Sequence, residues 1–62
     1  GGKESWISPN NVQISESAKL KNSVILDNCI IEDNVTISDS IISSDSIITA
    51  GTIINKEIIR KD

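Results

Sequence analysis

The residues that could carry out chemistry in this 62-residue chain are one thiol and a set of carboxylates, because the sequence contains no histidine. A catalytic cysteine needs a base or a cation beside its thiol, and Cys29 has neither in the neighbouring sequence. A single thiol without histidine also leaves too few ligands for a structural zinc site and no partner for an internal disulfide. We therefore expect no catalytic, cofactor-binding or metal-binding residue in this chain.

The carboxylates stand between short apolar pairs, where turns are expected. The acidic residues at these positions are Asp27, Glu32, Asp33, Asp39 and Asp45. Polar residues of this kind favour tight turns, and we interpret them as solvated turn residues. A weak calcium site beside Asp33 remains an alternative, because carboxylate oxygens are the ligands that this cation prefers.

Composition also limits the partners of the chain. A net charge of −3 and a single aromatic residue, Trp6, argue against a nucleic-acid-binding surface, which needs a basic face or a stacking platform. No apolar run approaches the roughly 20 residues of a membrane span, and no signal peptide is recognisable. A lone cysteine is typical of a reducing compartment, so we expect a cytoplasmic protein.

The chain is expected to hold one small domain. We interpret Gly1 and Gly2 as the remnant of a tag, residues 1–5 as tag and linker, and residues 6–62 as a domain cut from the C-terminal part of a larger parent. A domain of this size buries little core and needs a repetitive architecture or a partner to be stable.

A 17-residue repeat organises the sequence. Its three aliphatic columns hold Ile14, Ile31 and Ile48; Leu20, Ile37 and Ile54; and Ile25, Ile42 and Ile59. A small residue stands two positions before each aliphatic residue, with Glu57 as the exception. Side chains alternate along a strand, so both members of a pair point to the same side. The repeat therefore predicts short strands that bring the same columns together in every coil.

The residues between the pairs are turn formers. They interrupt the chain every five or six positions, which is too often for helices of ordinary length. We expect strands of three or four residues and a left-handed backbone conformation, which glycine and asparagine adopt most easily, in the column Ser17, Asn34 and Gly51. The sequence thus favours a coil that climbs and stacks on itself.

One aliphatic residue in about six, with a small residue two positions before it, resembles the hexapeptide-repeat family over residues 7–59. The resemblance implies an all-β, single-stranded, left-handed parallel β-helix of about three triangular coils. The left hand comes from the resemblance alone, because crossovers between parallel strands are ordinarily right-handed. Glycine, which is common after the aliphatic residue in the family, is missing here. Hexapeptide acyltransferases and carbonic anhydrases rely on histidine, so this chain by itself can house neither chemistry.

Two outer faces of such a prism would carry aliphatic side chains. Contiguous exposed apolar surface usually marks an interface, although isoleucine is also simply a good strand former. We predict an interface at Val24, Leu26, Ile30, Ile41, Ile47 and Ile58. The third face is expected to be polar apart from Ile53, and Trp6 to plug the open end of the prism or to pack on a preceding domain.

A narrower resemblance rests on residues 6–9, on the phrase Asn-Ser-Val-Ile-Leu-Asp-Asn at 22–28, and on residues 37–42. These segments are similar to the C-terminal β-helix of sugar-1-phosphate nucleotidyltransferases. In that family a Rossmann-like N-terminal domain joins a nucleoside triphosphate to a sugar phosphate with Mg²⁺, and the β-helix mediates assembly and sometimes allosteric control. The resemblance implies the chain's own N-terminal catalytic domain and further copies as partners. The nucleotide-binding motif has no counterpart here, so no catalytic residue is carried over.

Two other functions are compatible with the sequence. The chain could be a fragment of a hexapeptide acyltransferase whose histidine lies elsewhere. It could also be a non-enzymatic scaffold, similar to the tails in subunits of the eukaryotic initiation-factor guanine-exchange complex.

Overall fold

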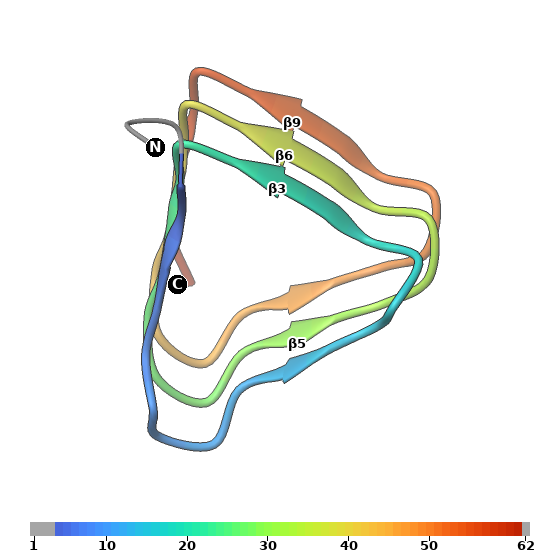
Figure 1. The fold of residues 1–62 in the computed structure, drawn as a ribbon. Coiled ribbons are helices and arrows are strands. Elements are labelled where there is room, and N and C mark those ends of the chain that lie inside the picture. Colours follow the sequence, from blue (N-terminus) through green and yellow to red (C-terminus); the bar gives the residue numbers. More distant parts are fainter. Residues whose placement is uncertain (1–3, 62) are drawn as a thin grey trace.

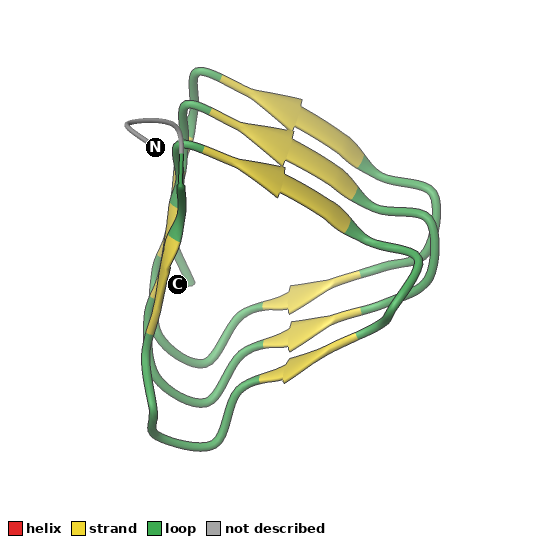
Figure 2. Cartoon of the chain, in the orientation of Figure 1, coloured by secondary structure: helices red, strands yellow, loops and turns green. Residues whose placement is uncertain are grey.

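The chain winds into a triangular prism whose three walls are small parallel sheets (Figure 1). The computed structural model describes residues 4–61, so Gly1, Gly2 and part of the expected linker lie outside the described residues. The strands are β1 (Trp6–Ile7), β2 (Gln13–Ile14), β3 (Lys19–Lys21), β4 (Val24–Ile25), β5 (Ile30–Ile31), β6 (Thr36–Ser38), β7 (Ile41–Ile42), β8 (Ile47–Ile48), β9 (Ile53–Asn55) and β10 (Ile58–Ile59). Within the described residues all regular structure is strand, joined by loops and turns (Figure 2).

Successive strands belong to different walls, and every third strand returns to the same one. Sheet A has the order β1-β4-β7-β10, sheet B the order β2-β5-β8, and sheet C the order β3-β6-β9. Viewed from the N-terminal end, the chain runs counterclockwise from β1 through β2 to β3 as it recedes, so the coil is left-handed (Figure 1). The predicted fold class is confirmed: the chain is an all-β, left-handed parallel β-helix of about three coils.

The register follows the 17-residue repeat. Ile14, Ile31 and Ile48 are partners on β2, β5 and β8, and the other two aliphatic columns stack in the same way on sheets A and C. In sheet A the first pair, Trp6 with Val24, is offset by 18 residues, because the corner after β1 has one residue more. The strands have two or three residues. The expected length of three or four was too long, because the corners take up more of each repeat.

The core is a stack of the predicted inward residues. The fully or almost fully buried ones are Ile25, Cys29, Ile31, Val35, Ile37, Ile42, Ile48 and Ile54. Half-buried members of the first and last coils, such as Leu20 and Ile59, complete it. The small residues two positions earlier include the buried Ser23, Ser40 and Ser46. The alternation of strand side chains therefore fills the prism with aliphatic side chains at its walls and small ones beside its corners.

The corners depend on residues with positive φ. These are Asn11, Asn22, Asn28, Asn34, Asp39, Asp45, Gly51 and Lys56. The prediction was right for Asn34 and Gly51 but wrong for Ser17. The Ala18 N–H donates to the Ser15 carbonyl at 3.0 Å in the Ser17 turn, as the Thr52 N–H donates to the Thr49 carbonyl at 3.2 Å in the Gly51 turn. The Oγ of Ser17 accepts the Asn34 N–H at 2.8 Å, so this serine joins two coils without the left-handed backbone.

A column of serines joins the coils where sheet C meets sheet A. Ser5, Ser23 and Ser40 form this serine ladder, in which each Oγ accepts the backbone N–H of the next coil. The corner is the tight one of the repeat, because Ile25 follows Leu20 by five positions whereas Leu20 follows Ile14 by six. Hydroxyl oxygens thus satisfy backbone donors that would otherwise be buried without an acceptor.

Candidate interaction surface

The outer side of sheet A carries one continuous row of apolar side chains. Trp6, Val24, Ile41 and Ile58 are register partners, and we call them the sheet A ladder. They precede the inward residues of β1, β4, β7 and β10 by one position, and consecutive strand residues point to opposite faces. The same alternation that builds the core therefore places the ladder on the outer wall.

The ladder is open to solvent along most of its length. Trp6 is 55% exposed, Ile41 40% and Ile58 58%, while Val24 is half-buried between its neighbours. Parallel strands of a sheet are about 4.8 Å apart, so four rungs cover about 14 Å of surface. Leu26, the remaining predicted residue on this face, is half-buried beside the ladder. Exposed apolar residues gathered in this way are unusual for a free surface.

Sheet B carries a shorter apolar row. Ile30 and Ile47 are register partners that are 37% and 61% exposed, with Gln13 on the first rung. Polar corner residues, among them Asp27 and Asn28, lie between this row and the sheet A ladder. The structure therefore brings the six predicted interface residues together as two patches on adjoining walls, four on sheet A and two on sheet B.

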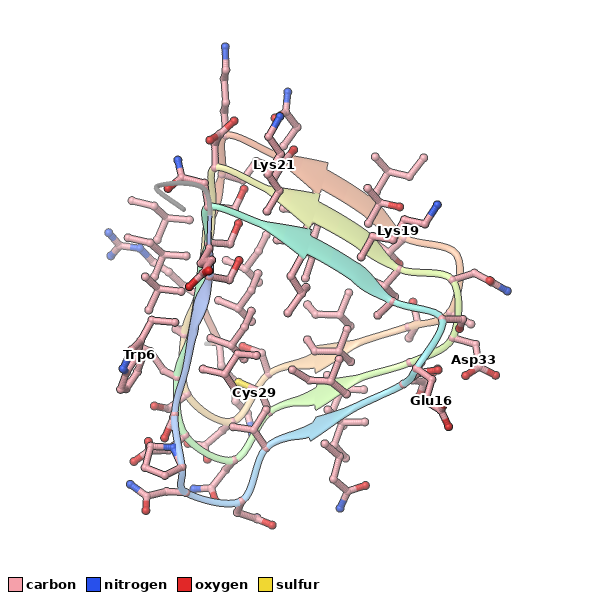
Figure 3. All side chains as sticks on the ribbon, in the orientation of Figure 1. Trp6, Glu16, Lys19, Lys21, Cys29 and Asp33 are labelled. Atoms are coloured by element: carbon pink, nitrogen blue, oxygen red, sulfur yellow. The ribbon has the colours of Figure 1, made fainter. Side chains whose placement is uncertain are left out.

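Sheet C has a polar outer side at its first two rungs. Lys19 and Lys21 project outward from β3, as Figure 3 shows, and their partners on β6 are Thr36 and Ser38. Ile53 on the last rung is 75% exposed and is the most exposed of the large apolar residues. Only one wall of the prism is thus apolar on every rung.

Trp6 does not plug the end of the prism. Its side chain lies on the outer side of the sheet A wall (Figure 3), and the inward position of β1 is taken by Ile7, which is 42% exposed at the open end. Trp6 was not included in the predicted interface, yet it is the largest member of the sheet A ladder. The signal that could have found it is the pair Trp6-Ile7, which has the same outward–inward order as Val24-Ile25.

Cys29 occupies the inward position that its column predicts. Its side chain is completely buried within the core (Figure 3), and its thiol donates to the Ser43 carbonyl at 3.1 Å. The hydrogen-bond partners of this thiol are the backbone carbonyls of Asp27 and Ser43, which are neither bases nor cations. A buried thiol of this kind behaves as a small apolar residue.

Most of the acidic corner residues accept hydrogen bonds from a neighbouring coil. Asp27 accepts from the buried hydroxyl of Ser8, and Asp39 accepts from the Asn22 side-chain amide at 2.7 Å. Glu32 accepts the backbone N–H of Ala50 at 3.1 Å. Among residues 4–61, no group of three or more acidic or cysteine side chains is placed to hold a metal ion. These carboxylates link one coil to the next, which is a role that spacing alone did not reveal.

Within the part of the chain that the structure describes, no helix is long and apolar enough to cross a bilayer.

A known protein family matches almost the whole chain. The family described as "GlmU-like, C-terminal hexapeptide" matches residues 3–61. Neither the comparison with curated proteins nor that with solved structures gave a match. The match covers the whole β-helix, including all four rungs of the sheet A ladder.

Proposed function

Because this chain belongs to the GlmU-like C-terminal hexapeptide family, we propose that it is the C-terminal assembly domain of a sugar-1-phosphate nucleotidyltransferase. In this role the β-helix holds the enzyme together, by packing on the catalytic domain of its own chain or on a further copy. The narrower resemblance of residues 6–9, 22–28 and 37–42 to the tails of those enzymes supports the assignment.

The observation that carries this proposal is the sheet A ladder. Four apolar residues in register leave one wall of a small prism without a charged residue on its central row. Stable interfaces bury about 800 Å² on each partner and have an apolar centre with a polar rim. The ladder has that character, because the polar corners that flank it would form the rim. Ile30 and Ile47 on sheet B would contact a second neighbour, since they lie on a different wall.

Catalysis is assigned to the parent's other domain. Cys29 is buried in the core, and the carboxylates of Glu32 and Asp39 accept hydrogen bonds from neighbouring coils. Mg²⁺ and both substrates would therefore bind in the N-terminal domain, where the cation would stabilise the charge of the phosphates. A cytoplasmic location accords with this proposal, because the one cysteine is free and persists as a thiol in a reducing compartment.

The proposal is tested by charges placed on the ladder. We expect sedimentation equilibrium to show self-association of the chain, or binding to the separately produced catalytic domain of its parent. Ile41→Asp should weaken that association at least about 100-fold, because a carboxylate would be desolvated at the centre of the interface. Ile53→Asp is the matched control, since Ile53 is exposed on the neighbouring wall and its replacement should leave association unchanged.

Circular dichroism shows whether each variant keeps its fold. A folded chain that stays monomeric at millimolar concentration and does not bind the catalytic domain would contradict the proposal. Equal effects of the two substitutions would instead show that the contact is not on sheet A.

A further inference from the structure

The column at the corner between sheets C and A changes character in the last coil. Ser23 and Ser40 are 3% and 4% exposed there, and the residue in the same register one coil later is Glu57, which is exposed. It is the one position at which the rule of a small inward residue fails. The exception falls at the C-terminal end of the prism.

The backbone of Glu57 nevertheless repeats that of the serines. The carbonyl of Glu57 accepts the Ile41 N–H at 2.9 Å, as the carbonyl of Ser40 accepts the Val24 N–H at 2.9 Å. The N–H of Glu57 donates to the Oγ of Ser40 at 3.0 Å, as the N–H of Ser40 donates to the Oγ of Ser23 at 3.1 Å. The Glu57 side chain thus starts from the place where the previous coils hold a buried hydroxyl.

A further coil stacked on this end would meet an obstacle. It would cover Glu57 as the last coil covers Ser40, and enclosing an ionised carboxylate in a space of serine size has a large desolvation cost.

We propose that Glu57 is an end cap, which closes the C-terminal end of the β-helix against a further coil of parallel strands from the same chain or from a second copy. The last strands β8, β9 and β10 each have only one neighbour, so they are edges to which other strands could add. A charged side chain at the edge is one of the devices by which proteins protect such edges, and solenoids generally need a polar terminal repeat. The cap does not depend on whether the outer walls bind a partner.

The proposal is tested by extending the chain with one additional coil at the C-terminal end of the prism. A copy of residues 46–61 is appended after Asp62, which continues the 17-residue repeat in register. The extension is made in the natural sequence and in the Glu57→Ser background, which restores the hydroxyl. Urea unfolding and amide hydrogen exchange are then compared between each extended chain and its unextended parent. Arg60→Ser is the matched control, because Arg60 is also an exposed charged residue and directly follows Ile59, the inward residue of β10.

We expect the added residues to exchange as an unfolded tail in the natural sequence and in the Arg60→Ser chain. In the Glu57→Ser chain the extension should raise the urea midpoint and slow exchange in β8–β10 by at least about tenfold, because the new coil covers their edges. An extension that stabilises all three chains equally, or none of them, overturns the proposal.

Discussion

The backbone N–H of Ser40 donates a hydrogen bond to the side-chain oxygen of Ser23, which lies one coil earlier at a distance of 3.1 Å. Ser40 repeats this contact with the next coil, because its own Oγ accepts the N–H of Glu57 at 3.0 Å. The same hydroxyl donates to the carbonyl of Ser38 at 2.7 Å. One hydroxyl therefore satisfies two backbone groups at a corner that is almost fully buried. The shortened corner of the repeat depends on these two hydrogen bonds.

Replacing Ser40 by alanine should be costly for so small a change. Ser40→Ala removes both hydrogen bonds of this hydroxyl. A typical intramolecular hydrogen bond contributes about 0.5–1.5 kcal/mol, so the free energy of unfolding should fall by about 1–3 kcal/mol. Urea unfolding followed by circular dichroism measures this loss. Ser44→Ala, at a neighbouring corner and outside the serine ladder, serves as the control and should change the free energy of unfolding by less than about 0.5 kcal/mol. Equal effects of the two variants would show that the ladder contributes little.

Much of this fold could be predicted from the sequence, because the 17-residue spacing of residues such as Ile14, Ile31 and Ile48 leaves few ways to bury them together. The serine ladder could not be predicted, because the sequence does not show whether an inward serine is there only for its small size or also to accept a hydrogen bond from the next coil. The handedness of the coil could not be predicted from the periodicity either, because a left-handed and a right-handed β-helix would show the same 17-residue repeat. Here the family resemblance supplied the correct answer.

The surface was harder to predict than the core. Both rows of outward isoleucines were found, because strand alternation fixes which residues face out. For Trp6 the sequence offers two interpretations, a plug of the open end and a contact with a preceding domain, and it does not choose between them. The corner after β1 has an additional residue, so the first coil departs from the strict repeat and its position could not be read from spacing alone.

The middle of the core should tolerate no shortening. Ile37 is completely buried between Leu20 and Ile54 on sheet C, so Ile37→Ala leaves a cavity and should cost about 2–5 kcal/mol. A domain of this size has little stability to lose, and we expect the far-ultraviolet spectrum of an unfolded chain at 37 °C. Ile53→Ala removes the same atoms from a side chain that is 75% exposed on β9. Its expected cost is below about 1 kcal/mol, and a similar loss in both variants would contradict the assigned core.

The backbone at Gly51 should limit what can replace it. Its φ is +79°, and a Cβ built there meets no atom within 4 Å, so any penalty comes from the backbone conformation and not from a clash. Gly51→Ala should therefore reduce the free energy of unfolding by about 1–2 kcal/mol. Gly51→Asn should cost less, because asparagine holds the equivalent position at Asn34 with a φ of 57°. Thermal unfolding ranks the three chains, and an alanine variant as stable as the asparagine variant would be against this explanation.

The thiol of Cys29 reports on the opening of the whole prism. It is completely buried and its column is enclosed by neighbouring coils, so a thiol reagent reaches it only when the coils separate. Labelling should be slow in buffer and fast in urea. Because labelling follows the population of the open state, Ile37→Ala should accelerate it about tenfold for each 1.4 kcal/mol of stability lost. Ile53→Ala should leave the rate nearly unchanged. Rapid labelling of the natural chain under native conditions would mean that the coils around Cys29 open locally, independently of the rest of the core.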